Sequence, residues 1–238
     1  MSARAQLIIL WWAFIFMVIF ALAWTFLLHM VPLPPATLTV PEVVDFYTQN
    51  ASDIKLGAAI ASWTSAFWVP FTVVVAVQMA RLERGRIPVW SILALVGGVL
   101  SSMFIVFPPI MWGVIAFNPG RDPNSTALLN EMANLTLTTT DQFFIFQMIA
   151  MTYVSFTQKN VPHSPFPRWY GWFNFWIAII FEVGAMAFLF KTGPFAWNGL
   201  FVYWFPFCGF FIWLTTTMYL MRSKLKLQLV DEMLLEKA

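Results

Sequence analysis

Charged residues are scarce in this chain: Asp, Glu, Lys and Arg make up 10% of its 238 residues, whereas 60% are hydrophobic. A typical soluble domain carries about 25% charged residues, so this composition excludes a water-facing surface over most of the chain. The mean hydropathy of +0.74 agrees and predicts an integral membrane protein in contact with the lipid bilayer. The net charge of +2 comes from basic residues in short loops, which argues against a nucleic-acid partner.

Residues that bind metals or form covalent bridges are equally rare. The single cysteine, Cys208, lies inside an apolar run, which excludes a disulfide framework and a thiolate metal cluster. The two histidines, His29 and His163, are expected on opposite sides of the membrane, which argues against a di-iron site or a bis-histidine haem. No lysine lies within an expected span, so a retinal Schiff base is not expected. The sequence therefore indicates no metal site and no particular cofactor.

Six apolar runs are long enough to cross a bilayer, whose core of about 30 Å needs about 20 residues of helix. The fourth run is the weakest, because it carries Gln147 and Thr152. The sequence predicts an all-α fold: a single integral membrane domain over residues 1–238, built as a six-helix transmembrane bundle. The expected spans are about 7–30, 57–80, 88–115, 141–158, 169–190 and 198–221.

The basic residues predict an orientation, because cytoplasmic loops are enriched in lysine and arginine. With six spans, one side of the membrane receives most of the basic residues and the other side most of the acidic ones. We therefore expect both termini in the cytoplasm. The basic residues of the expected inner side are Arg4, Arg81, Arg84, Arg86, Lys159, Arg168, Arg222, Lys224 and Lys226, and those of the outer side are Lys55, Arg121 and Lys191.

Two short extracytoplasmic helices are expected in the long outer loops. Thr39-Val-Pro-Glu42 resembles a capping box with proline in the first turn. Asp122-Pro123 can start a second helix that runs to about Asn134. Such helices could act as lids over an outward-facing cavity, or they could shield the ends of spans. The sequence is compatible with both interpretations.

Glu182 is the unusual residue of the chain, because it lies near the middle of the fifth span. A carboxylate at that depth is costly unless it is neutral, paired or hydrated. By the i, i+4 rule it shares a helix face with Asn174, Ala178 and Ala185, which is small and polar as expected of a bundle interior. Glu182 is predicted as the polar contact of a ligand, with Asn174 and, on the fourth span, Gln147 as support. A protonated structural carboxyl and an acid/base catalyst are the alternatives.

A pattern of aromatic residues and proline occurs in two spans, as Phe67-Trp-Val-Pro-Phe71 and Tyr203-Trp-Phe-Pro-Phe207. Proline leaves a backbone carbonyl one turn earlier without its helical partner, and paired broken helices can frame a site near the membrane midplane. Deep aromatic side chains can also line a pocket for a flat apolar ligand. Trp68 and Trp204 are therefore added to the predicted ligand-binding residues, although chance or simple kinking also explains the pattern.

Three further stretches stand out: Val43-Val-Asp-Phe-Tyr-Thr-Gln-Asn50 running to Ile54-Lys-Leu-Gly57, Phe166-Pro-Arg-Trp-Tyr-Gly-Trp172, and Lys191-Thr-Gly-Pro-Phe-Ala-Trp-Asn-Gly199. Together they resemble a group of uncharacterised bacterial integral membrane proteins with six spans. The group has no established activity, so the resemblance implies a bacterial inner-membrane protein but no mechanism.

Three hypotheses for function follow. The favoured one is non-enzymatic: the protein binds, or helps to move, a small hydrophobic molecule at an outward-facing site between spans four, five and six. The second is an accessory or scaffold subunit of a larger redox or photosynthetic membrane complex, which would contact other subunits or a second copy through its sides. The third is a membrane-embedded isomerase or hydrolase with Glu182 as acid/base. An enzyme usually needs a second catalytic group within reach, and the sequence offers only loose candidates.

Overall fold

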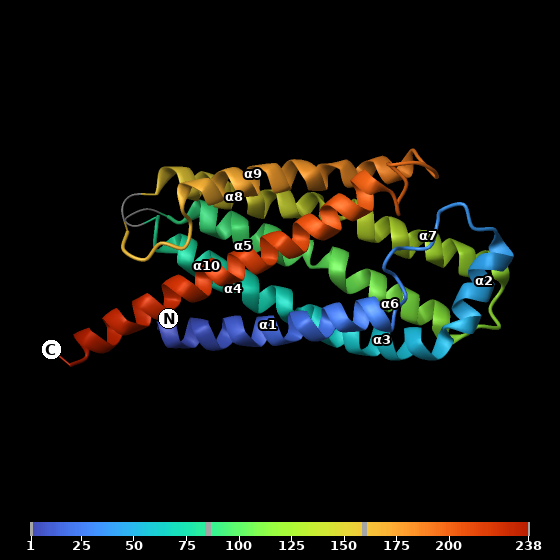
Figure 1. Ribbon diagram of the computed structural model, residues 1–238, viewed down its shortest axis with the longest axis horizontal. Helices are drawn as coiled ribbons and strands as arrows, with labels where there is room; N and C mark the ends of the chain where they lie inside the picture. The colour runs from blue at the N-terminus through green and yellow to red at the C-terminus, as the bar shows by residue number, and fades with distance from the viewer. Residues whose placement is uncertain (1, 84–86, 159–160, 238) are drawn as a thin grey trace.

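Helices are the only regular elements in residues 2–83, 87–158 and 161–237, which the computed structural model describes (Figure 1). The predicted all-α fold is thereby confirmed for this part of the chain. Short 3-10 and π segments join several of the α-helices: η1 (Ser65–Phe67), η2 (Asp141–Phe143), η3 (Val183–Phe188) and η4 (Leu200–Trp204). The α-helices are α1 (Ala3–Phe26), α2 (Val40–Gln49), α3 (Ala51–Thr64), α4 (Trp68–Ala80), α5 (Val89–Ser101), α6 (Met103–Phe117), α7 (Pro123–Thr139), α8 (Phe144–Thr157), α9 (Arg168–Glu182) and α10 (Phe205–Leu235).

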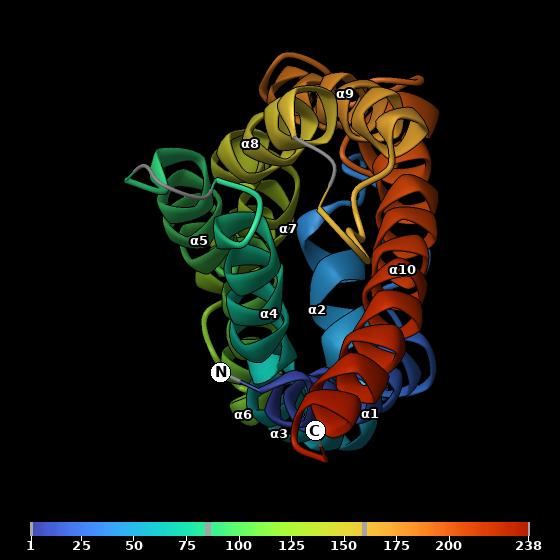
Figure 2. The ribbon, with the colours of Figure 1, turned by 90° about the vertical axis from the view of Figure 1, so that its left-hand side faces the viewer.

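Several helices continue one another, so that long rods of helix run along the long axis of the molecule (Figure 1). α3 and α4 form one rod through η1, α5 and α6 form another across Ser102, and α7 and α8 form a third through η2. Seen along the long axis, α1, α4, α5, α8, α9 and α10 surround the interior of the bundle (Figure 2).

Five helical segments are long and apolar enough to cross a membrane, and they correspond to five of the six expected spans. The fourth expected span, 141–158, is not among them, because α8 has only 14 residues. At 1.5 Å per residue α8 covers about 21 Å, so it needs η2 and the end of α7 to match a bilayer core. The bundle of six membrane spans therefore stays a prediction. The five segments are Ala3–Phe26, Ala51–Ala80, Val89–Phe117, Arg168–Phe188 and Leu200–Leu235.

The break between α7 and α8 has a local cause in the sequence, a run of three threonines at 138–140. Each threonine hydroxyl donates a hydrogen bond to the backbone carbonyl four residues earlier, at 2.6–3.1 Å. Such side-chain bonds compete with the main-chain ladder and bend helices. The rod is accordingly interrupted at Thr140, and η2 follows.

The two expected loop helices, α2 and α7, are present at one end of the molecule (Figure 1). Thr39 and Glu42 form a reciprocal capping box at the start of α2, in which the Thr39 backbone N–H donates to Glu42 Oε2 at 2.7 Å. Asp122 caps α7 by accepting from the Ser125 backbone N–H at 2.8 Å. Both helix starts were correctly predicted, and α7 runs on past Asn134 to Thr139.

The first and last helices meet at the opposite end. The Ala3 backbone N–H donates to both carboxylate oxygens of Glu232 at 3.0 Å. Beside this contact, Gln78 Nε2 donates to Gln6 Oε1 at 2.7 Å and Gln228 Nε2 donates to Gln78 Oε1 at 3.0 Å. These buried amides hold α1, α4 and α10 together and place the start of α1 and the end part of α10 on the same end of the bundle (Figure 1).

Most of the basic residues that predicted the orientation lie toward this end, at the start of α1 and α9 and in the second half of α10. Arg84, Arg86 and Lys159, which entered the same prediction, lie outside the described residues. The side of the membrane that this end faces stays a prediction.

Candidate functional site

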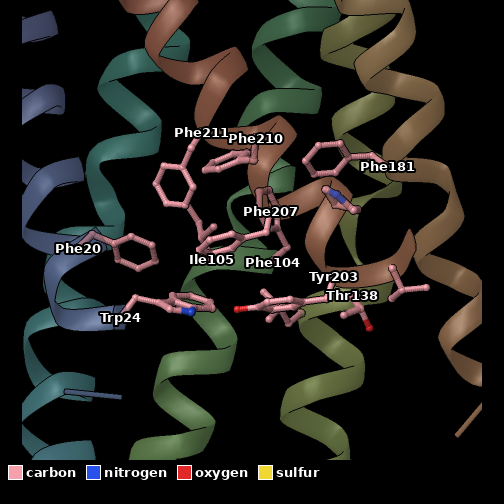
Figure 3. A pocket seen from close by; sticks show the side chains of 13 residues that line it. Phe20, Trp24, Phe104, Ile105, Thr138, Phe181, Tyr203, Phe207, Phe210 and Phe211 are labelled. Atoms are coloured by element: carbon pink, nitrogen blue, oxygen red, sulfur yellow. The ribbon is translucent and has the colours of Figure 1, made fainter. Parts of the chain in front are cut away.

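The candidate site is a cavity where α1 nears its end and α6 and α10 begin (Figure 3). Its volume is about 70 Å³, measured as the space open to the centre of a water-sized sphere. One water needs about 10–15 Å³ on this measure, so the cavity has room for several methyl-sized groups. Aromatic side chains dominate its lining, which consists of Phe20, Trp24, Phe104, Ile105, Leu137, Thr138, Phe181, Val202, Tyr203, Pro206, Phe207, Phe210 and Phe211.

Three lining side chains carry polar atoms, and two of them are already hydrogen-bonded. Tyr203 Oη donates to the Met30 carbonyl at 2.7 Å, and Thr138 Oγ1 donates to the Asn134 carbonyl at 3.1 Å. Trp24 differs: its side chain is buried, with 5% exposed, and its Nε1–H contacts the Tyr203 hydroxyl outside the limits of standard hydrogen-bond geometry. This N–H points toward the Tyr203 hydroxyl across the cavity lining (Figure 3). A buried donor held in so poor a geometry gains only part of the energy of a hydrogen bond, so a ligand oxygen placed there would be stabilised.

A buried polar chain holds Trp24 in place and connects it to the two loop helices. The Trp24 ring packs edge-on against Trp112, with 5.1 Å between centroids. Trp112 Nε1 donates to Asn134 Oδ1 at 3.1 Å, and Asn134 Nδ2 donates to Asn130 Oδ1 at 3.2 Å. Tyr47 Oη of α2 also donates to Asn130 Oδ1, at 2.9 Å, and burial raises the pKa of Tyr47, so that this hydroxyl stays a donor. α2 and α7 are thus tied to the wall of the cavity.

An irregular helical segment, η4 with the first turn of α10, forms one side of the cavity. η4 is a π segment, a geometry that is rare and is often found at functional sites. Pro206 is the second residue of α10 and lacks a backbone N–H. Tyr203 and Pro206 turn into the cavity, whereas Trp204 faces outward with 36% of its surface exposed. The helix thus changes from π to α geometry within the 203–207 pattern and remains continuous, and Trp204 does not line the cavity.

None of the five predicted ligand-binding residues lines this cavity, although three are buried in the packed layer beside it. Trp68 directly contacts the cavity lining: its ring stacks on the lining residue Phe210, with 5.3 Å between centroids and 24° between planes. Its Nε1–H donates to the Gly98 carbonyl at 2.6 Å. Trp68 therefore supports the cavity wall instead of facing a ligand.

Asn174 and Gln147 are both fully buried and both serve the packing of this layer. Asn174 Oδ1 accepts from Trp213 Nε1 at 2.7 Å. Gln147 Nε2 lies 3.5 Å from Thr72 Oγ1, while Gln147 Oε1 has no partner among the described residues. The structure thus joins Trp68 and Asn174 through Trp213, whose ring centroid lies 6.0 Å from that of Trp68.

The expected interior position of Glu182 is wrong, because the residue is exposed on the outside of the bundle. Each four-residue step along an α-helix rotates by about 40° beyond a full turn. Two such steps from buried Asn174, through Ala178, carry Glu182 away from the interior. The buried positions continue instead through Phe181 and Gly184, where 3-10 geometry replaces the α-helix. Glu182 is therefore not brought together with Gln147 in the buried layer, and its role as a ligand contact stays a prediction.

The cavity residues that sequence reasoning missed carry weak local signals. Trp24 sits in an ordinary apolar helix, and nothing in its neighbours marks it as a buried donor. Tyr203 was part of the aromatic and proline pattern, and its position before the proline is the signal that could have identified it. Asn130 and Asn134, four residues apart on α7, could have indicated a buried polar face.

Comparisons with protein-family models, curated proteins and solved structures find no match. The chain is an integral, multi-pass helical membrane protein. This conclusion rests on the chain itself: five helical segments of suitable length and hydropathy, with large apolar side chains exposed along them. The family resemblance drawn from the sequence stays a prediction.

Proposed function

We propose that this protein binds, or helps to move, a small hydrophobic molecule in the cavity beside Trp24 and Tyr203. The observation that carries the proposal is the Trp24 Nε1–H, a buried donor whose contact with the Tyr203 hydroxyl lies outside standard hydrogen-bond geometry, in a mostly apolar cavity. A ligand oxygen would satisfy this donor, and the aromatic lining would bury the apolar body of the ligand. The site involves α1, α6, α7, α9 and α10, in place of the spans four to six expected from the sequence.

The shape of the site favours a ligand that enters from the bilayer. A volume of about 70 Å³ holds the end of a chain-like molecule and not its whole length. Phe207 and Phe211 are only half-buried, so the remainder of the chain can pass between them toward lipid. We therefore infer a lipid-soluble molecule with an oxygen-bearing end, such as a long-chain alcohol or ketone.

The proposed setting is a bacterial inner membrane crossed six times, with both termini in the cytoplasm. The contact between Ala3 and Glu232 supports it, because an even number of crossings brings both ends of the chain to one side. The cavity then lies toward the outer leaflet, below α2 and α7. Tyr47 and Asn130 join these two helices over it, which supports the interpretation of both as lids.

A photoreactive hexadecanol carrying a diazirine tests this function on the protein in phosphatidylcholine nanodiscs. We expect adducts in residues 20–24 and 203–211, which unlabelled hexadecanol competes away. Trp24→Phe keeps an aromatic ring but removes the N–H, and should lower the yield of these adducts about tenfold, the value of one hydrogen bond. Trp63→Phe makes the same change on an exposed side chain and is the matched control.

Uniform labelling of all lipid-facing helices, unchanged by Trp24→Phe, would contradict the proposal. Stoichiometric polypeptides that co-purify with the protein, together with an unlabelled cavity, would favour the accessory-subunit hypothesis instead. The acid/base hypothesis gains no support from the geometry, because Glu182 does not line the cavity.

A further inference from the structure

Three basic residues depart from the gathering of cations at the end where α1 begins, because they lie toward α2 and α7: Lys55, Arg121 and Lys191. Lys191 is paired, with its Nζ 3.5 Å from Glu131 Oε1. Lys55 and Arg121 have no carboxylate partner within 4 Å in the described part of the chain. Lys55 and Arg121 are therefore two cations without a carboxylate partner among the described residues, at the end of the molecule where α2 and α7 lie.

The acidic residues closest to them in sequence are already engaged elsewhere. Asp53 Oδ2 lies 3.2 Å from His29 Nε2. Asp122 caps α7 through the Ser125 backbone N–H. Neither carboxylate pairs with Lys55 or Arg121, so both positive charges can bind a group outside the chain.

Lys55 and Arg121 line one groove between α3 and α6, with a volume of about 380 Å³ on the same measure as the cavity. From Lys55 to Ser62 the groove follows α3 for seven residues, about 10 Å of helix. Small side chains make room along it, and apolar ones form the rest of its surface: Ala58, Ala59, Ser62, Ile110, Gly113, Val114 and Phe117. The groove shares no residue with the cavity beside Trp24.

We propose that this groove binds an anionic phospholipid, with the phosphate at Lys55 and Arg121 and an acyl chain along the small residues. Arg121 Nη2 donates to the Val114 carbonyl at 3.3 Å, which holds the guanidinium over the groove. Its other N–H groups can take phosphate oxygens, and Lys55 adds a second positive charge. The exposed large apolar residues Ile110, Val114 and Phe117, which line the groove, show that its α6 side faces lipid. An apolar helix in the groove would leave both cations uncompensated, which disfavours a second membrane protein as the occupant.

Native mass spectrometry of the protein released from nanodiscs tests the proposal directly. The nanodiscs contain equal amounts of phosphatidylglycerol and phosphatidylcholine with identical acyl chains, so that the two lipids differ only in headgroup. We expect the protein to retain phosphatidylglycerol preferentially. Lys55→Gln and Arg121→Gln should each lower its retention about fivefold, the value of one basic residue near an anionic lipid surface. Lys191→Gln removes the same charge from the paired lysine and should leave retention unchanged.

Two further measurements distinguish a site that binds a whole lipid from a site that binds only an anion. Ala59→Leu fills the groove without changing the charge and should lower retention of the lipid. Millimolar inorganic phosphate should fail to displace it, because phosphate has no acyl chain. Equal retention of the two lipids by the wild type, an equal loss with Lys191→Gln, or displacement by phosphate would each overturn the proposal. Lys55, Ala59 and Lys191 are exposed and Arg121 is half-buried, and the melting temperatures of the four variants confirm folding before the lipid measurement.

Discussion

At the scale of single residues, one methyl group at Gly98 tests the packing of the buried layer beside the cavity. A Cβ at this position would lie 2.4 Å from Thr72 Cγ2 and 2.8 Å from Gln147 Nε2, closer than real Cβ contacts. Helix propensity alone would favour alanine by about 1 kcal/mol, but overpacking costs about 1–3 kcal/mol. Gly98→Ala should therefore lower the melting temperature of the detergent-solubilised protein. At Gly120 the nearest atom to an added Cβ is 3.7 Å away, so Gly120→Ala should be near neutral. Equal melting temperatures would mean that the layer is looser than described.

Residue positions on a helix were predictable only over short distances. The interior position of Asn174 is confirmed, because it lies one turn from the small residues that mark the buried face. The predicted interior position of Glu182 was wrong, because two four-residue steps accumulate about 80° of rotation and because 3-10 geometry begins at Val183. Neither effect is visible in a sequence of uniformly apolar neighbours.

At the scale of elements, the capping box of α2 predicts a dependence on pH. Hydrogen bonds from the Thr39 backbone and hydroxyl hold the pKa of Glu42 below its ordinary value of 4.5. Because the folded pKa is lowered, the stabilisation is present above pH 4.5 and is lost as the pH falls through the folded value. We expect hydrogen exchange, corrected for intrinsic rates, to show faster opening of α2 in Glu42→Gln than in the wild type at neutral pH. The two proteins should converge in acid, with peptides of α4 as the internal reference. Equal protection at neutral pH would show that the carboxylate does not stabilise α2.

The helices whose first residues are capped by a nearby side chain were predicted best. The starts of α2 and α7 follow from Thr39, Glu42 and Asp122, each within three residues of its hydrogen-bond partner. The fourth expected span, 141–158, agrees in its bounds with η2 and α8, but this helical segment is too short to count among the candidate membrane spans, and the helix breaks just before it at the threonines 138–140. Apolar length identifies membrane helices well, but it does not show where a helix breaks.

At the scale of the whole molecule, the cavity was not predictable from the sequence. Its lining comes from α1, α6, α7, α9 and α10, so residues up to about 190 positions apart meet in one place. Aromatic residues make up 18% of the chain, so an aromatic side chain by itself carries little information about position. Trp24 and Trp63 are alike in sequence context, yet one is 5% and the other 73% exposed. Only the packing of the bundle determines that Trp24 is buried and Trp63 is exposed.

The topology of the whole chain can be decided by cysteine labelling. In a Cys208→Ser background, single cysteines replace Ser2, Asn124 and Lys237, all exposed in the structure. With six crossings and cytoplasmic termini, a membrane-impermeant maleimide should label Asn124→Cys in intact cells, and should label Ser2→Cys and Lys237→Cys only after permeabilisation. Five crossings would put Ser2 and Lys237 on opposite sides. That outcome conflicts with the bond between Ala3 and Glu232, which requires both ends of the chain to share one side. Labelling of both termini in intact cells, with Asn124→Cys protected, would keep six crossings but reverse the orientation, and would move the cavity to the inner leaflet.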